Sequence, residues 1–189
     1  MSNPAVISIP QTRAQQWVRQ GAIVISASLF VALCAKVTLP LPFTPVPLTL
    51  QNFGVLAVGL TLGWRRGLAA LLIYLVEGAM GLPVFSPAGP GGIAQILGPT
   101  GGFLMAYPLV AALAGWLMDR GNQTFMRAAV ASFFAEILLF VGGLSWLAFW
   151  TGSIAQAVRF GLYWFVFAEV IKILLAASTS LRARRWLRA

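Results

Sequence analysis

Long apolar runs alternate with short polar or proline- and glycine-rich stretches along this chain of 189 residues. A helix needs roughly 20 mostly apolar residues to cross the hydrocarbon core of a bilayer, so the chain has room for about six such helices joined by short loops. We therefore expect an all-α, polytopic membrane protein, a six-transmembrane-helix bundle that occupies residues 20–180. The runs that predict the six helices cover residues 20–39, 48–63, 67–82, 100–118, 125–150 and 157–178.

The stretches between these runs predict three loops on one side of the membrane, near residues 40–47, 82–99 and 151–156. The first, PLPFTPVP, holds four prolines that lack a backbone donor and prevent a continuous helix. The second is too rich in glycine and proline to face lipid. Irregular backbone at membrane depth must be buried in protein or face water, so both loops are expected to lie over a protein interior or outside the bilayer.

Composition supports the membrane assignment and excludes several function classes. Hydrophobic residues make up 59% of the chain, charged residues 9%, and the mean hydropathy is +0.86. The net charge of +9 does not predict a nucleic-acid partner, because the basic residues punctuate apolar runs and do not cluster on one polar surface. The sequence has no histidine and one cysteine, Cys34, so we expect no metal, no cofactor and no enzymatic activity.

The distribution of arginine predicts the orientation of the chain. Ten arginines flank the runs on one side of the membrane, and only Arg159 lies on the other. Basic loops stay in the cytoplasm, so both termini are expected there. Residues 1–19 then form a cytoplasmic segment before a retained signal-anchor helix, and residues 181–189 form a basic cytoplasmic tail that also suits contact with membrane lipid.

Five ionisable residues lie inside the apolar runs, where each costs about 2.5–3.5 kcal/mol to insert and therefore needs a partner or a function. Glu169 and Lys172 are three residues apart and share one helical face. This pair is either a simple ion pair that fixes helix packing or a polar recognition point in an apolar cavity. Lys36 and Glu77, near the outer ends of their helices, either pair with each other, which we favour, or belong to a binding mouth. Glu136 has no evident partner.

The segment GPTGGF (98–103) opens the fourth run. Thr100 is a plausible N-cap, and the free N–H groups at Gly101 and Gly102 would suit a ligand carboxylate. The same glycines would also let two helices approach closely, and the motif does not choose between these readings. Candidate walls for a ring-shaped ligand are the aromatic residues Phe43, Phe85, Tyr107, Trp146 and Trp150, although for any single one of them a place in the core or an interfacial belt is favoured.

Four ordered motifs carry a resemblance that extends from the first helix to Ala177: PFTPVPLTLQNFGVLAVGLTLG, YLVEGAMGLPVFS, GPTGGFLMAYPLVAALAGWL and VIKILLAA. The sequence resembles the BioY family, the biotin-specific S components of energy-coupling factor transporters. The resemblance implies a six-helix bundle with an outward-facing cavity for the vitamin, roofed by the loops after the first and third helices. It also implies that the chain captures biotin for uptake by an ATP-driven importer in the inner (plasma) membrane of a bacterium.

The late motif of that family reads proline, glycine, aspartate, two apolar residues and lysine, and its aspartate and lysine lie in the biotin site. The matching positions here are Phe167, Ala168, Glu169 and Lys172. By resemblance, Glu169 accepts from a ureido N–H, and Lys172 donates to a ligand oxygen or holds Glu169 in place. The loss of the Pro-Gly pair predicts a less kinked sixth helix. The glycine-rich stretch 89–95, with Gly91, Gly92 and Gln95, would lie near the valerate carboxylate.

The resemblance also implies partner subunits. The chain lacks a Walker-type phosphate loop, so energy must come from a separate ATPase together with a transmembrane coupling subunit. Small residues with three residues between them on the first helix contact that subunit in the family, and Ser28 and Ala32 are the candidates here. The alternatives are an S component for riboflavin or thiamine, a solitary biotin carrier, an intramembrane enzyme using Glu136 or Glu169 as a base, and a scaffold subunit.

Overall fold

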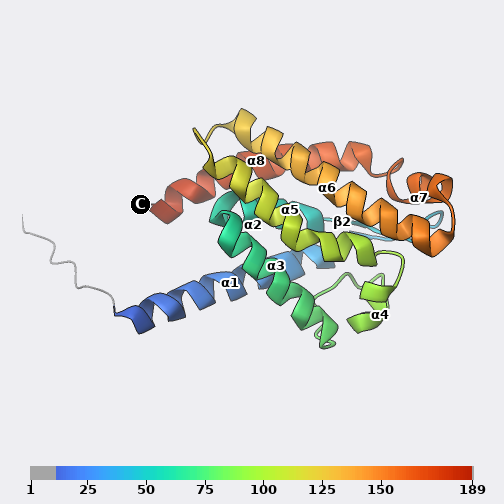
Figure 1. Ribbon diagram of the computed structural model, residues 1–189, viewed down its shortest axis with the longest axis horizontal. Helices are drawn as coiled ribbons and strands as arrows, with labels where there is room; N and C mark the ends of the chain where they lie inside the picture. Colours follow the sequence, from blue (N-terminus) through green and yellow to red (C-terminus); the bar gives the residue numbers. More distant parts are fainter. Residues whose placement is uncertain (1–11, 189) are drawn as a thin grey trace, which may run out of the picture.

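The computed structural model describes residues 12–188, and within that range the chain forms eight helices and one two-stranded ladder (Figure 1). Residues 1–11 of the predicted cytoplasmic segment, and Ala189 of the predicted tail, lie outside the described residues. In chain order the elements are α1 (Arg13–Lys36), β1 (Thr38–Leu39), β2 (Leu48–Thr49), α2 (Gln51–Leu62), α3 (Trp64–Ala79), α4 (Gly92–Leu97), α5 (Gly101–Asp119), α6 (Phe125–Thr151), α7 (Ile154–Gly161) and α8 (Val166–Arg188).

The six predicted helices correspond to α1, α2, α3, α5, α6 and α8, which confirms the helical bundle. Two helices extend beyond their apolar runs: α1 begins at Arg13, where Thr12 forms a capping box with Gln15, and α8 continues through the basic tail to Arg188. Two loops contain structure that the sequence analysis did not predict. A short helix, α4, interrupts residues 82–99, and the antiparallel pair β1–β2 closes the proline-rich loop at its base.

The sixth run is not one continuous helix, so the expectation of an unbroken segment over 157–178 was wrong. The chain breaks between α7 and α8, and the two helices meet at a bend of 52°. The break places Phe165 in a buried cluster with Val46, Leu147 and Ala157, a contact that a straight helix would not make. The helix α8 itself is continuous through Phe167–Lys172, so the bend lies just before the substituted motif.

Among the described helices, α1, α5 and α6 are each long and apolar enough to cross a membrane, and the bent pair α7–α8 forms a fourth candidate span. The helices α2 and α3 have only 12 and 16 residues. At a rise of 1.5 Å per residue they are about 18 and 24 Å long, which is less than a bilayer core of about 30 Å. Most residues of α2 are buried, so its short length leaves little backbone exposed to lipid.

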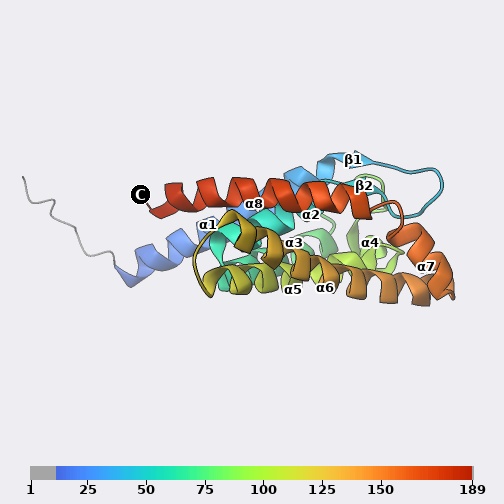
Figure 2. The ribbon, with the colours of Figure 1, turned by 90° about the horizontal axis from the view of Figure 1, so that it is seen from above.

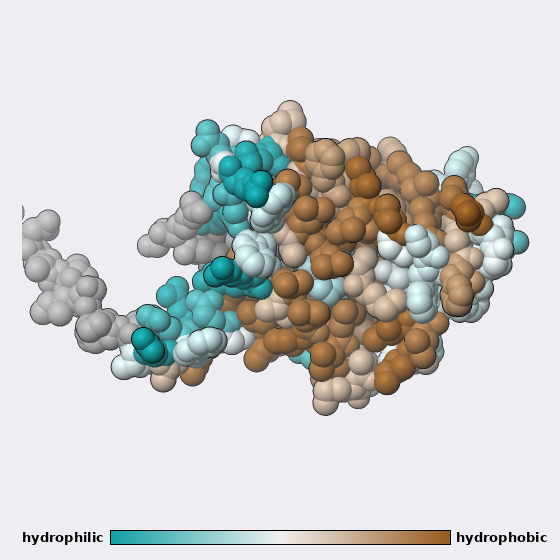
Figure 3. Space-filling model, viewed as in Figure 1, coloured by the Kyte–Doolittle hydropathy of each residue, from teal (hydrophilic) through white to brown (hydrophobic). Residues whose placement is uncertain are grey.

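The helix α2 lies at the centre of the bundle. It packs against α1, α3, α5 and α8, and Figure 2 shows α8 along one side of the bundle and α5 and α6 along the other, with α2 between them. Apolar residues gather around the middle of the visible surface in Figure 3, and hydrophilic residues gather at the end where α1 begins and α5 meets α6. This distribution is that of a protein surrounded by lipid, with one strongly polar end.

Glycines set the closest helix contacts. A Cβ at Gly102 on α5 would lie 2.2 Å from Cβ of Trp146 and 2.6 Å from the carbonyl oxygen of Gly142, both on α6. A Cβ at Gly59 on α2 would lie 2.3 Å from the carbonyl oxygen of Ala111 on α5. These distances are shorter than van der Waals contact, so no other residue fits without separating the helices.

We expect Gly102→Ala to lower the thermal unfolding midpoint of the detergent-purified protein, because overpacking of this kind costs about 1–3 kcal/mol. Gly21→Ala is the matched control, since a Cβ there meets nothing within 4 Å and alanine favours a helix. Equal midpoints for Gly102→Ala and the unmodified chain, by light scattering or intrinsic fluorescence, would contradict the close contact.

Candidate functional site

A small cavity of about 60 Å³ lies inside the bundle, next to the break between α7 and α8. Its polar end is formed by Glu169 and Lys172 from α8 and Asn52 from α2. Six apolar or aromatic side chains from α5, α6 and the α7–α8 turn also line it: Phe103, Leu104, Tyr107, Leu139, Phe140 and Phe165. An apolar cavity with a few convergent polar groups is typical of a site for a small molecule.

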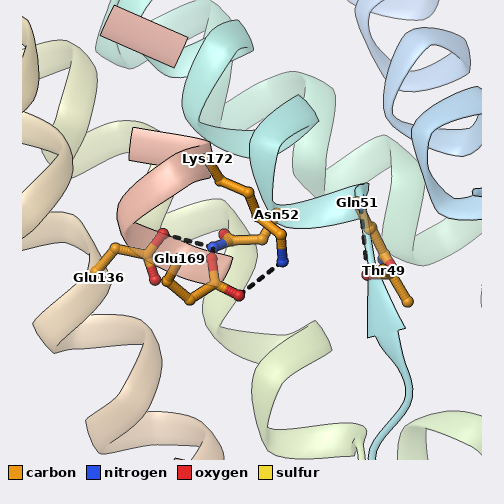
Figure 4. Close-up of polar contacts among 6 residues, drawn as sticks. All are labelled: Thr49, Gln51, Asn52, Glu136, Glu169 and Lys172. Carbon is orange, nitrogen blue, oxygen red and sulfur yellow. Dashed lines mark hydrogen bonds and ion pairs between the residues drawn. The ribbon is translucent and has the colours of Figure 1, made fainter. Parts of the chain in front are cut away.

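The polar end of the cavity is a hydrogen-bonded cluster centred on Asn52 (Figure 4). The amide Nδ2 of Asn52 donates to Glu136 Oε1 at 2.5 Å and to Glu169 Oε2 at 2.7 Å. Lys172 Nζ donates to the other oxygen of Glu169 at 2.7 Å, and all four residues are buried. One amide therefore joins two carboxyl groups from α6 and α8, and one ammonium balances part of their charge.

The Glu169–Lys172 spacing correctly predicted an ion pair on one helical face, and the structure adds that the pair lines a cavity. The lysine ammonium has three N–H donors and uses one on Glu169 among the described residues, so two remain for a ligand oxygen. A carboxylate has about four acceptor sites, so Glu169 keeps acceptor capacity after its two bonds. This end of the cavity can donate and accept at the same time.

The structure gives Glu136 a partner that the sequence left open, and it shows that the favoured pairing of Lys36 with Glu77 was wrong. Glu136, which had no evident partner in the sequence, accepts from Asn52, because α2 and α6 bring together residues 84 positions apart. Lys36 and Glu77 do not pair with each other: Lys36 Nζ donates to the carbonyl oxygen of Phe85 at 3.1 Å, and Glu77 accepts from the hydroxyl of Ser28. Both residues stabilise helix and loop packing outside the cavity lining.

The two loops that were predicted to cover the cavity, residues 40–47 and 82–99, both contribute side chains to its lining. Val46 and Pro47 come from the proline-rich loop, and Ser86 and Gln95 come from the segment after α3.

Polar contacts fasten these loops to each other and to the bundle. The hydroxyls of Thr38 and Ser86 lie 3.0 Å apart, and Thr44 Oγ1 donates to the carbonyl oxygen of Phe160 at 2.7 Å. A second chain of bonds runs from Gln51 Nε2 to Tyr74 Oη at 2.8 Å, and from that hydroxyl to the carbonyl oxygen of Val84 at 2.9 Å. The two loops that cover the cavity are therefore held in place by hydrogen bonds.

The structure brings four of the predicted site residues to the cavity lining: Glu169, Lys172, Gln95 and Tyr107. Gly91 and Gly92 do not line it. They adopt φ of 73° and 59°, a left-handed conformation that glycine tolerates, and turn the chain into α4. The N–H of Gly91 donates to Gln95 Oε1 at 3.1 Å, so this turn orients the Gln95 amide.

Four of the five predicted aromatic residues lie outside the cavity lining, and one of them, Trp150, is 52% exposed. Phe43 is 47% exposed and packs on Trp164, with ring centroids 4.5 Å apart. Phe85 is buried against Tyr74 and Gly78. Trp146 Nε1 donates to the carbonyl oxygen of Gly98 at 2.8 Å and so fixes the end of the α4 loop on α6.

The GPTGGF segment acts mainly in packing. Thr100 makes no side-chain cap, and the Gly101 N–H donates to the carbonyl oxygen of Gly98 at 3.0 Å. A Cβ at Gly101 would lie 1.7 Å from the carbonyl oxygen of Ile96, so this glycine permits the tight turn into α5. Thr100 nevertheless lines the cavity, which keeps one hydroxyl of the motif within reach of a ligand.

The predicted partner contacts on α1 face inward. Ser28 is fully buried and donates to Glu77 on α3, and Ala32 is only 8% exposed. These two small residues therefore bring α1 close to the bundle and present little surface to another subunit.

Sequence reasoning missed Asn52, Gln51 and the aromatic walls Phe103, Phe140 and Phe165. Asn52 and Gln51 lie in the motif PFTPVPLTLQNFGVLAVGLTLG, from which no role was predicted for either residue. The available signal was the position of two adjacent amides at the start of an otherwise apolar helix, since buried amides must be hydrogen-bonded. The described residues contain no group of three or more metal-ligating side chains of the His, Cys, Asp and Glu types.

Comparison with known proteins places the chain in a family. The sequence model of the BioY family matches residues 7–189. The chain belongs to the BioY family. It is 38% identical over 146 residues to the "Probable biotin transporter BioY" of Pyrococcus horikoshii, covering 77% of this chain and 85% of the relative. It is 33% identical over 162 residues to the biotin transporter BioY of Thermotoga maritima, covering 85% and 95%.

A solved structure supports the same assignment. The S component for biotin from an ECF-type ABC transporter, a crystal structure at 2.1 Å, superposes with a TM-score of 0.82 at 26% identity. The match covers 93% of this chain and 95% of that one. The chain is thus a multi-pass membrane protein with the S-component fold, as the sequence motifs predicted.

A double-mutant cycle tests the Asn52 bridge. Asn52→Leu should lower the free energy of unfolding by about 1–3 kcal/mol, because it leaves buried acceptors without a donor. In a Glu136→Leu background the same change should cost at least about 0.5 kcal/mol less, the coupling expected of residues in contact.

Ser132→Ala provides the control for this cycle. Ser132 lies on α6, the helix that carries Glu136, and its hydroxyl has no hydrogen-bond partner among the described residues. Its effect should add to that of Asn52→Leu in reversible unfolding in mixed micelles. Strict additivity for the Asn52 and Glu136 variants would show that the bridge contributes nothing.

Proposed function

We propose that this protein captures biotin and delivers it for uptake as the substrate-binding S component of an ATP-driven importer. The observation that carries the proposal is the cavity in which Glu169, Lys172 and Asn52 form one polar end within apolar and aromatic walls. The relatives named for biotin transport and the matching biotin S component support the same substrate.

The polar end of the cavity suits the ureido group of biotin. That group has two N–H donors and one carbonyl acceptor, and Glu169 and Lys172 offer the opposite functions side by side. The bicyclic ring is apolar at its sulfur side and fits against Phe103, Phe140 and Phe165. Gln95 and Thr100 also line the cavity, and their side chains are suited to bind the valerate carboxylate.

Binding requires movement of the roof. A cavity of about 60 Å³ has room for only a few water-sized groups, which is too little for a bicyclic vitamin and its acyl chain. The proline-rich loop covers the cavity through Val46 and Pro47 and is held by the Thr44–Phe160 bond. Outward displacement of this loop opens the site, and its return excludes water from the bound vitamin.

The distribution of arginine supports an orientation of the bundle in the membrane, and membership of the family supports the partner subunits. The arginine-rich end of the bundle lies in the cytoplasm with both termini, and the lid loops face outward. The importer supplies energy through a coupling subunit and an ATPase, and this chain itself performs no catalysis. Because Ser28 and Ala32 are buried, the coupling subunit contacts other, exposed positions of the bundle.

Lys172→Met should weaken biotin binding at least about tenfold, because hydrogen bonds from a charged group contribute roughly 1.5–3 kcal/mol. Lys36→Met is the matched control: it removes the same group from a residue outside the cavity lining and should bind near the wild-type affinity. Isothermal titration calorimetry of the detergent-purified chain measures both.

Lys172→Arg is the control for loss of folding, because it keeps a cation beside Glu169 and changes only the geometry of the N–H donors. It should retain the thermal midpoint and lose part of the biotin affinity. Wild-type affinity in both Lys172 variants would contradict the site. Binding of riboflavin or thiamine without binding of biotin would contradict the substrate.

A further inference from the structure

The carboxyl group of Glu136 is buried in the bundle but does not line the cavity. It comes from near the middle of α6, where Oε1 accepts from the Asn52 amide and Oε2 has no hydrogen-bond partner within residues 12–188. Asn52 Oδ1, on the same amide, is also buried without a partner in that range. Native proteins pair nearly all of their buried polar atoms, so these two oxygens require a donor.

Two carboxyl groups meet at one nitrogen atom in this cluster (Figure 4). Asn52 Nδ2 donates to Glu136 Oε1 at 2.5 Å and to Glu169 Oε2 at 2.7 Å, so the two accepting oxygens can be no farther apart than the sum of these distances. Lys172 supplies an ammonium, which bonds the other oxygen of Glu169. With both carboxyl groups ionised, one negative charge would remain uncompensated among these four residues. Like charges this close in an apolar interior favour a proton on one of them.

The hydrogen bonds assign that proton to Glu136. Glu169 accepts from an ammonium and from an amide N–H, two donors that stabilise a carboxylate. Among the described residues, Glu136 accepts from the Asn52 amide alone. A proton on Glu136 Oε2 makes that oxygen a donor, and Asn52 Oδ1 is an acceptor on the side chain that already bonds Glu136. One proton thus supplies the donor that both unpaired oxygens lack.

The other titratable groups that face Glu136 come from α5 and α8. Tyr107 on α5 is buried near both carboxyl groups, and Glu169 and Lys172 face Glu136 from α8. The helix α2 contributes the neutral amide described above, and Arg159 on α7 is exposed. A change in charge at Glu136 would therefore act on Glu169 and Lys172, the two groups proposed to bind the ureido group.

We propose that Glu136 carries a proton when biotin binds and acts as a positioning residue, a neutral acid that holds Asn52 against Glu169 without adding a second negative charge. The inference rests on the proposed function, because its ligand is biotin. Loss of the proton leaves a carboxylate that attracts the Lys172 ammonium away from the ligand oxygen and repels the anionic valerate group. Biotin binding therefore weakens as the pH rises.

Isothermal titration calorimetry of the detergent-purified chain tests this dependence between about pH 6 and about pH 9, a range in which free lysine and tyrosine keep their protons. The unmodified chain should lose at least about threefold in biotin affinity toward the alkaline end, and at most about tenfold per pH unit, the limit for release of one proton. Glu136→Gln should bind near the unmodified affinity at the acidic end and keep it as the pH rises. Glutamine accepts through Oε1 and donates through Nε2 without ionising.

Glu77→Gln is the matched control. Glu77 also lies within a helix of the bundle, accepts from Ser28 and does not line the cavity, so this variant should show the pH dependence of the unmodified chain. A flat pH profile in the unmodified chain would overturn the proposal. An equal loss of affinity in Glu136→Gln would also overturn it, because the titrating group would then lie elsewhere. Absence of biotin binding at every pH would instead contradict the proposed function.

Infrared difference spectroscopy of the chain without biotin tests the proton independently of the ligand. At the acidic end of the range, subtracting the spectrum of Glu136→Gln from that of the unmodified chain should leave the C=O stretch of a protonated carboxyl group. The band should weaken as the pH rises. Its absence at the acidic end would show that Glu136 is ionised there and would overturn the proposal even if biotin binds.

Discussion

The structure depends on satisfying polar groups inside a membrane bundle where water is scarce. The amide of Asn52 supplies a donor to one oxygen of each of two carboxyl groups, through bonds of 2.5 Å to Glu136 and 2.7 Å to Glu169. An unpaired polar group at this depth costs several kcal/mol, so the three helices that carry these residues are held in one arrangement. The same contacts orient Glu169 and Lys172 toward the cavity. Packing and recognition therefore rely on the same bonds.

The short, buried helix α2 makes this arrangement possible. Because it does not extend across the whole bilayer, the chain before it is free to form the β1–β2 ladder and the proline-rich loop above the cavity. Glycines at Gly59 and Gly102 bring α2, α5 and α6 into close contact, and the break before α8 adds Phe165 to the wall. The cavity lies where these irregular features meet, below the loops that cover it.

Local patterns in the sequence predicted the parts of this arrangement that depend on neighbouring residues. Hydropathy located the helices, and a spacing of three placed Glu169 and Lys172 together. The role of Asn52 depends on contacts with residues 84 and 117 positions away, which no local pattern encodes. The sequence also could not show that Ser28 faces the protein interior. Lipid and protein interior are both apolar, so an apolar helix has no clear difference between its lipid-facing and protein-facing sides. The bend before α8 was missed for the same reason, since hydropathy does not change at Phe165.

A high-resolution structure of the chain bound to biotin tests the polar cluster as a binding site most directly. We predict that the ureido group lies within hydrogen-bond distance of both Glu169 and Lys172, that Asn52 still bridges Glu136 and Glu169, and that the ring packs on Phe103 and Phe140. A structure in which biotin lies elsewhere, or in which Asn52 has turned away from both carboxyl groups, would contradict this site.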